Sequence, residues 1–244
     1  MIRFILAALF VILFLIWSIP VSFVEWLIGK KWPDIKAKSS LAYVNWAFRV
    51  ILCISGVRLT MIGHEKIPTD TAVLYVGNHR SIFDIVVTYP KVVGLTGYIA
   101  KIELLKVPLL RTWMKNLRCL FLNRKDSKEG LKTILTGIEM MKQGTSMCIF
   151  PEGTRSKAEG EFLPFHAGSF KLAEKSGCPI VPMTLNNTGA IFEDHFPFIK
   201  KTHVILEYGD PIYVKDLDRE AKKSLPEDVK NIIEQTFEKN KALV

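Results

Sequence analysis

An unbroken run of 21 uncharged residues, Phe4–Val24, is the feature that most restricts what this chain can fold into. As a helix the run would reach about 31 Å at ~1.5 Å per residue, which is enough to cross the hydrocarbon core of a bilayer. Pro20 lies near its end and is compatible with a kink, so the run either spans the membrane or inserts into one leaflet. We therefore predict a membrane anchor in this part of the chain.

A secretory signal peptide is the alternative interpretation of this run. Only Arg3 supplies a charge before it, the run is longer than the apolar core of a signal peptide, and no A-x-A cleavage site follows. The residues that follow include Lys30, Lys31, Lys36 and Lys38. Positive residues beside a span mark the cytoplasmic side, so we expect the rest of the chain on the cytoplasmic side of the cell membrane.

Two further features associate residues 1–56 with the membrane. The stretch Leu41–Ile54 carries a single charge and is too short to span, so it predicts an interfacial or core helix. Four of the five tryptophans also lie in this region, as expected for aromatic anchoring at the level of the lipid headgroups. We therefore expect a membrane-binding segment over 1–56, with a linker at Gly29–Ser40, and an α/β domain over 57–244.

The composition favours a membrane surface over other partners. The chain has 33 Lys and Arg against 24 Asp and Glu, a net charge of +9, and 49% of its residues are hydrophobic, which indicates lipid rather than nucleic acid. The four cysteines are far apart and match no zinc pattern, so we expect no metal, no disulfide framework and a reducing compartment. The sequence contains neither a Walker-type glycine loop nor G-x-G-x-x-G, so no nucleotide cofactor is indicated.

After Gly56, short apolar runs alternate with helical stretches. This alternation is typical of an α/β fold, with a mixed, mostly parallel sheet flanked by helices. The predicted strands are Val57–Ile62, Ala72–Gly77, Gly97–Ala100, Cys119–Asn123, Ser146–Phe150, Ile180–Leu185 and Val204–Tyr208. The predicted helices are Ser81–Tyr89, Pro108–Lys115, Ser127–Gln143, Ala167–Lys175 and Glu227–Lys241.

The first chemically suggestive segment is NHRSIFD, Asn78–Asp84, which directly follows a predicted strand. Ligands of open α/β sheets bind at the carboxyl ends of strands, so this is a suitable place for a site. On one regular helix His79 and Asp84 would point about 140° apart, so they meet only if His79 lies in the loop and Asp84 in the first helical turn. A Ser81 cap would provide that boundary. The Ser81-x-x-Asp84 spacing also fits a capping box, in which Asp84 would have a purely structural role.

The second segment is FPEGTRS, Phe150–Ser156, which also continues from a predicted strand. Arg155 is suited to bind a phosphate because its planar guanidinium donates two parallel hydrogen bonds. Glu152 is placed either to hold Arg155 or to meet a substrate hydroxyl. A surface turn with a salt bridge is the alternative for this motif.

NHRSIFD followed about 70 residues later by FPEGTRS closely resembles the signatures of the glycerolipid acyltransferase family, and within it the 1-acylglycerol-3-phosphate (lysophosphatidate) acyltransferases. The resemblance covers about residues 57–210. The N-terminal hydrophobic region is similar to the membrane-binding helical segment of the family.

The resemblance implies a role for each matched residue. His79 would be the general base and Asp84 its orienting partner. Lys101, in AKIEL, would join Arg155 in holding the substrate phosphate. The other implied substrate-binding residues of FPEGTRS are Glu152, Gly153 and Thr154.

Two weaker blocks complete the likeness. In LRCLFLNR the resemblance implies that Phe121 and Arg124 line the glycerol-phosphate site, and in IVPM it singles out Pro182. The first of these blocks departs from the usual pattern, because Arg118 stands where a glycine is common and Asn123 replaces a frequent Asp. Core strand and turn is the alternative interpretation of both blocks.

The reaction that the resemblance implies is transfer of a fatty acyl group from acyl-CoA or acyl-carrier protein to the sn-2 hydroxyl of lysophosphatidate, giving phosphatidic acid in phospholipid biosynthesis. No cofactor is expected. His79 would remove the hydroxyl proton while Asp84 fixes the imidazole tautomer. Ser81 is then a cap rather than a nucleophile, and backbone N–H groups near Gly153 are candidates for oxyanion donors.

Three alternatives remain at this point. A sister acyltransferase could use glycerol-3-phosphate or another lysophospholipid through the same motifs. A serine hydrolase is less favoured because the sequence has no G-x-S-x-G elbow. A non-catalytic lipid-binding membrane protein is disfavoured by the presence of both His79 and Asp84.

Overall fold

The computed structural model describes all residues from 1 to 244, arranged around one seven-stranded sheet. The strands lie in the order β1-β7-β6-β2-β5-β3-β4. Their bounds are β1 Arg58–Ile62, β2 Leu74–Gly77, β3 Thr96–Lys101, β4 Leu120–Leu122, β5 Ser146–Ile149, β6 Ile180–Asn186 and β7 His203–Tyr208. Each of the seven predicted strands is confirmed, with small shifts at the ends.

The directions of the strands decide where the loops meet. β6, β2, β5, β3 and β4 are parallel to one another, whereas β7 is antiparallel to β6 and parallel to β1. The predicted mixed, mostly parallel sheet is therefore confirmed. Since parallel neighbours end at the same edge, the segments that follow these five strands begin side by side, and this edge carries the candidate site.

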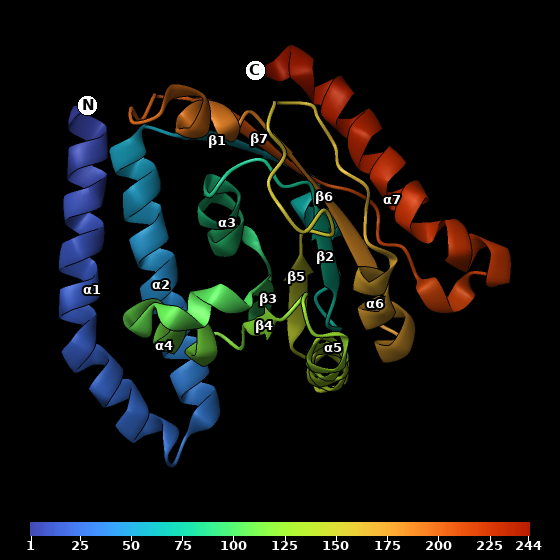
Figure 1. Ribbon diagram of the computed structural model, residues 1–244, viewed down its shortest axis with the longest axis horizontal. Coiled ribbons are helices and arrows are strands. Elements are labelled where there is room, and N and C mark those ends of the chain that lie inside the picture. Colours follow the sequence, from blue (N-terminus) through green and yellow to red (C-terminus); the bar gives the residue numbers. More distant parts are fainter.

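Helices cover both faces of the sheet (Figure 1). The first face packs against α1, α2, α3 and α4, and the second against α5, α6 and α7. β2 is buried on both sides, because Tyr75 belongs to the first core cluster while Leu74 and Val76 belong to the second. The helix bounds are α1 Ile2–Gly29, α2 Pro33–Ser55, α3 Phe83–Thr88, α4 Pro108–Asn116, α5 Ser127–Lys142, α6 Lys171–Ser176 and α7 Arg219–Asn240.

The N-terminal region forms two long helices that lie side by side and run in opposite directions (Figure 1). The predicted linker Gly29–Ser40 is wrong, because α2 begins at Pro33. Proline is favoured in the first turn of a helix, and the acidic Asp34 beside it interacts well with the positive end of the helix dipole. α2 ends at Ser55, and the next residue, Gly56, has a φ of 73° in the left-handed region that glycine adopts without strain.

α1 is the one helix long and apolar enough to cross a membrane, with a mean hydropathy of 2.8 over its most apolar stretch. It is not separate from the body of the protein, because Ala7 of α1 and Val44 of α2 belong to the same core cluster as Tyr75. The division into 1–56 and 57–244 stays a prediction.

Several details of the remaining chain differ from expectation. α7 begins at Arg219 rather than Glu227, because the Asp218 carboxylate caps it by accepting from the Ala221 N–H at 2.8 Å. Arg118, which replaces the glycine common in the family, has a φ of 59° in the left-handed region that glycine favours. Its guanidinium donates to Thr145 Oγ1 at 2.6 Å. The four cysteines are free thiols, and three of them are buried.

Candidate active site

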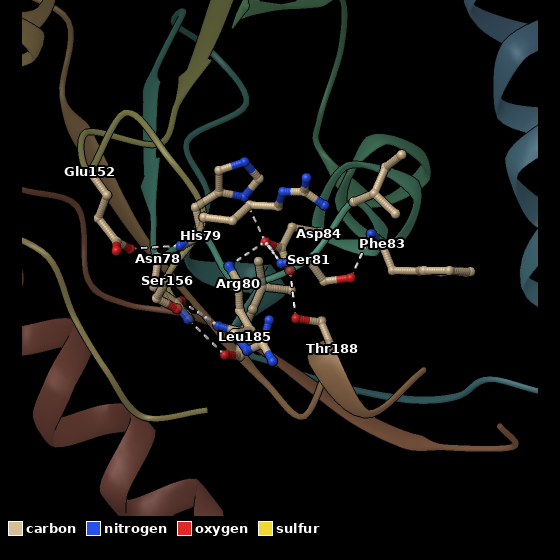
Figure 2. Close-up of polar contacts among 12 residues, drawn as sticks. Asn78, His79, Arg80, Ser81, Phe83, Asp84, Glu152, Ser156, Leu185 and Thr188 are labelled. Atoms are coloured by element: carbon tan, nitrogen blue, oxygen red, sulfur yellow. Dashed lines mark hydrogen bonds and ion pairs between the residues drawn. The ribbon is translucent and has the colours of Figure 1, made fainter. Parts of the chain in front are cut away.

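The two sequence motifs meet because the strands before them are parallel neighbours. NHRSIFD follows β2 and FPEGTRS follows β5, and these strands pair with Val76 opposite Ile149. The backbone then joins the two motifs directly, since the Ser156 N–H donates to the His79 carbonyl at 2.8 Å. Figure 2 shows the side chains that converge there.

His79 and Asp84 form the predicted pair. Nδ1 of His79 lies 2.7 Å from Oδ2 of Asp84. The imidazole stacks on the Phe150 ring, with 4.4 Å between ring centroids, and the His79 side chain keeps 17% of its surface exposed while that of Asp84 has none. His79 lies in the loop and Asp84 in the first turn of α3, which is the arrangement that their spacing requires.

Four donors converge on the buried Asp84 carboxylate (Figure 2). In addition to the imidazole, the Arg80 and Ser81 N–H groups each donate to Oδ2 at 2.8 Å. The Thr188 hydroxyl donates to Oδ1 at 2.5 Å. These contacts compensate the burial of the charge, and they fix the carboxylate against His79.

Ser81 caps the start of α3 as expected. Its Oγ accepts from the Phe83 N–H at 2.9 Å and donates to Glu193 at 2.5 Å. The residue is fully buried, so its hydroxyl is not available as a nucleophile. Asp84 accepts from the Ser81 N–H, as in a capping box, and from the His79 ring, so a structural and a catalytic role of Asp84 are compatible with each other.

Glu152 supports the His79 backbone rather than Arg155. One carboxylate oxygen accepts from the His79 N–H at 2.7 Å and the other from the Leu163 N–H at 3.1 Å. Burial raises the pKa of the Glu152 carboxyl, while these two hydrogen bonds act in the opposite direction. The expectation that Glu152 holds Arg155 is therefore wrong, since both of its oxygens accept from backbone groups and Arg155 pairs with Glu193. A contact between Glu152 and a substrate hydroxyl stays a prediction.

Gly153 is required by the shape of the turn. Its φ is 73°, and a Cβ at this position would lie 3.0 Å from the Arg124 guanidinium, which donates to the Gly153 carbonyl. The Gly153 N–H donates to the Phe150 carbonyl at 3.0 Å. This N–H is therefore not available as an oxyanion donor, which corrects that expectation for Gly153 itself.

The remaining predicted substrate-binding residues lie in different surroundings. Lys101 is the last residue of β3 and Arg124 follows the neighbouring β4. Both line a cavity of about 180 Å³, together with Glu103, Leu122, Asn123 and Lys125. Thr154 is exposed. Phe121 is half-buried in β4 and does not line this cavity.

Pro182 is a core residue of β6, where it lies opposite Val76 of β2. Its carbonyl accepts from the Gly209 N–H, and the whole strand is buried. The alternative interpretation of IVPM as core strand is therefore the correct one for Pro182.

A third segment, which the sequence did not single out, completes the site. It connects β6 to β7 and contributes Thr188, Glu193 and Asp194. Thr188 bonds Asp84, as described above, and Asp194 pairs with the Arg80 guanidinium. Glu193 accepts from the Ile82 N–H at 2.8 Å and from Arg155 Nη1 at 2.9 Å. The only local signal was the position of Thr188 just after a predicted strand, at the edge where ligands bind.

Comparison with known proteins identifies the family of this chain. The model of the family described as Acyltransferase matches residues 58–186, which is more than half of the chain. The chain belongs to the acyltransferase family. This acyltransferase is 28% identical to the 1-acyl-sn-glycerol-3-phosphate acyltransferase of Borreliella burgdorferi over 82% of its own length and 79% of the relative. It is 34% identical to the probable 1-acyl-sn-glycerol-3-phosphate acyltransferase of Mycoplasma pneumoniae, over 63% of its own length and 57% of that relative.

A solved structure shares the fold of this acyltransferase. The crystal structure of the 1-acyl-sn-glycerophosphate (LPA) acyltransferase from Thermotoga maritima superposes with a TM-score of 0.81 at 24% identity, covering 99% of this chain and 98% of the other. The match includes the two N-terminal helices as well as the sheet, so the entire arrangement in Figure 1 is a known fold.

Glu152→Gln tests the support of the His79 backbone. The amide offers one acceptor where the carboxylate offers two, so one of the two buried N–H groups loses its partner, at a cost of ~1–3 kcal/mol in the free energy of unfolding. Because the pKa of Glu152 is raised in the folded state, the folded wild type binds more protons than the unfolded chain between the ordinary carboxyl pKa and the raised one. The stability of the wild type relative to Glu152→Gln should therefore fall as the pH rises through this window. Thermal melting at pH 4.5 and pH 7 measures both effects, and an unchanged difference between these pH values would contradict the second.

Proposed function

We propose that this protein transfers a fatty acyl group from acyl-CoA or acyl-carrier protein to the sn-2 hydroxyl of 1-acyl-sn-glycerol-3-phosphate, forming phosphatidic acid without a cofactor. Family membership supports acyl transfer, and the names of the relatives support this acceptor. The observation that carries the proposal is the His79–Asp84 pair at 2.7 Å, held at the edge of the sheet where five strands end.

The pair suits His79 as a general base. A carboxylate accepts hydrogen bonds, so the contact with Asp84 assigns the ring proton to Nδ1 and leaves the lone pair on Nε2. Nε2 would take the proton of the acceptor hydroxyl while the hydroxyl oxygen bonds to the thioester carbon. As the tetrahedral intermediate collapses, the C–S bond breaks and the imidazolium returns its proton to the thiolate. The thioester is already activated, so no covalent enzyme intermediate is needed.

The acceptor phosphate would be bound by basic side chains around this pair. Arg155 is half-exposed and lies next to the catalytic loop through Glu193, while Lys101 and Arg124 line the neighbouring cavity. A phosphate matches the guanidinium fork, and the ammonium group adds charge. Glycerol-3-phosphate carries the same phosphate and is the alternative acceptor.

The test compares the rate of acyl transfer for each combination of acceptor and acyl donor. Purified protein is incubated with radiolabelled lysophosphatidate, glycerol-3-phosphate or lysophosphatidylcholine, each with acyl-CoA and with acyl-carrier protein thioester. We expect phosphatidic acid from lysophosphatidate at a kcat/KM well above that for the other acceptors. Equal or faster use of glycerol-3-phosphate would assign the alternative reaction.

We also propose that α1 lies in the cytoplasmic leaflet, alongside the domain, rather than crossing the bilayer. The N-terminal half of α1 is attached to the body: Phe4 stacks on Phe192 at 5.8 Å and Phe14 lies 6.4 Å from Trp113. Its C-terminal half is attached to α2, where Glu25 accepts from the Ser39 hydroxyl at 3.0 Å. A perpendicular span would draw these body residues into hydrocarbon. In the turn after α1, Lys30 lies over the Trp26 ring at 3.7 Å, a pairing suited to the headgroup level.

Depth labelling tests this orientation. In a Cys53→Ser background the remaining cysteines are buried, so a single introduced cysteine can carry a fluorophore. Ile16 on α1 and Phe196 beside its N-terminal end are 58% and 72% exposed, and Leu135 on α5 is the matched control at 53%. In reconstituted vesicles, quencher-labelled acyl chains should quench labels at Ile16→Cys and Phe196→Cys and spare Leu135→Cys. A quenched Ile16→Cys with an unquenched Phe196→Cys would contradict the in-plane placement.

A further inference from the structure

Glu193 contacts both sequence motifs of the site, although it belongs to neither. It opens the short 3₁₀ helix Glu193–His195 between β6 and β7, and its side chain is 16% exposed. One carboxylate oxygen accepts from the Ile82 N–H at 2.8 Å and from Arg155 Nη1 at 2.9 Å, and the other accepts from Ser81 Oγ at 2.5 Å. A single carboxylate therefore joins the catalytic loop to the guanidinium of the other motif.

The segment around Glu193 is itself held on both sides. Asp194 pairs with Arg80, and Thr188 bonds Asp84. Phe192 stacks against Phe4 of α1 with an interplanar angle of 8°. These contacts leave the Glu193 carboxylate little freedom, so whatever it binds is fixed relative to the His79–Asp84 pair.

Arg155 has free N–H donors that could bind a ligand. A guanidinium has five N–H donors, and Glu193 accepts from Nη1, so the rest of the fork stays free. The Arg155 side chain is 50% exposed, and so these donors are accessible from solvent. Both oxygens of Glu193 are already used by protein donors, and its negative charge would repel a phosphate, so Glu193 is not suited to touch the acceptor itself.

We propose that Glu193 is a positioning residue, which aims the Arg155 fork at the acceptor phosphate and ties it to the loop that carries His79. This inference rests on the proposed function, since it takes the phosphate of lysophosphatidate as the ligand of Arg155. In this way the β6–β7 connection sets the distance between the bound phosphate and the general base His79. That distance in turn places the sn-2 hydroxyl next to His79.

Glu193→Ala and Glu193→Gln distinguish positioning from other roles. The alanine variant releases Arg155, and we expect the KM for lysophosphatidate to rise about 10-fold, the equivalent of ~1.4 kcal/mol. The glutamine variant keeps an oxygen for the Ile82 and Arg155 donors, so its KM should stay within about 3-fold of wild type. Glu220→Ala removes a surface Lys–Glu pair on α7 and is the matched control, with unchanged kinetics.

A double-mutant cycle with Arg155→Ala separates this role from a structural one. If Glu193 acts through Arg155, adding Glu193→Ala to Arg155→Ala should leave the KM nearly unchanged. An equal rise in KM in both backgrounds, accompanied by a lower melting temperature, would show that Glu193 only stabilises the fold and would overturn the proposal.

Two further outcomes would also decide against it. A KM for Glu193→Gln well below that of wild type would mean that Glu193 competes with the phosphate for Arg155 instead of aiming it. A Glu193→Ala variant with wild-type KM would remove any role in binding. The wild type serves as the reference for the proposed function: if it does not acylate lysophosphatidate, that function fails, whereas an active wild type with an unaffected Glu193→Ala refutes this inference alone.

Discussion

Replacing His79 with alanine is expected to lower kcat for acyl transfer by about 10²–10⁴-fold, because a positioned general base contributes a factor of this size. The melting temperature should change little. The ring is partly exposed and makes one polar contact, and Asp84 keeps three other donors after its removal. Initial rates with lysophosphatidate and the thermal melt of the same preparation measure both quantities.

His166→Ala is the matched control, since His166 is exposed and lies in the same loop as the second motif. It should retain the wild-type kcat. Normal turnover by a folded His79→Ala variant would remove His79 from the mechanism.

Asp84→Asn should be more damaging to the fold than the change at His79. The carboxylate accepts from four donors, and an amide turns one of its two acceptors into a donor that faces them. We therefore expect a loss of kcat together with a loss of stability, so this variant by itself does not isolate the tautomer effect.

Arg155→Ala is expected to weaken lysophosphatidate binding by about 10- to 150-fold, because a hydrogen bond to a charged group is worth roughly 1.5–3 kcal/mol. The same variant should barely change the use of 1-monoacylglycerol, which has no phosphate for Arg155 to bind. KM values for both acceptors, in the wild type and in the variant, give the comparison. Lys101→Ala should behave in the same way if the cavity that it lines also receives the phosphate.

The comparison of the two acceptors can also contradict the proposal that Arg155 binds the phosphate. If the wild type uses monoacylglycerol as well as lysophosphatidate, no phosphate clamp exists at this site. If the Arg155→Ala variant loses the same factor with both acceptors, Arg155 supports the fold of the loop instead of binding the phosphate.

The type and approximate position of most elements could be predicted from the sequence. Apolar runs such as Ala72–Gly77 and Ser146–Phe150 specify strands through local propensity and burial, and these runs also place the motifs that follow them at strand ends. The spacing of His79 and Asp84 was sufficient to state the loop-to-helix geometry in which they meet, which is the geometry observed. The prediction of a linker at Gly29–Ser40 was wrong because a proline is compatible with the end of a helix and also with its first turn. Pro33 is the first residue of α2.

The partners of the motif residues depended on tertiary structure. Glu152 and Arg155 are three positions apart and were expected to pair, yet the Glu152 carboxylate accepts from the His79 backbone on the other side of the turn at Gly153. Arg155 instead meets Glu193, 38 residues further along. Two acidic residues in a connection are ordinarily solvated, so nothing local distinguished Glu193 from any surface carboxylate.

The sequence by itself thus determined an apolar N-terminal helical region, an alternating α/β body and a His–Asp pair after a strand, because periodicity, charge and spacing are local properties. Only the tertiary structure decided that β2 lies between β6 and β5, and this order brings Thr188 to Asp84 across 104 positions of the chain. Strand order depends on how all the strands and helices pack together, and this cannot be read from any single segment of the sequence. The two motifs could therefore be found in the sequence, whereas the residues that hold them together, such as Thr188 and Glu193, were found only in the fold.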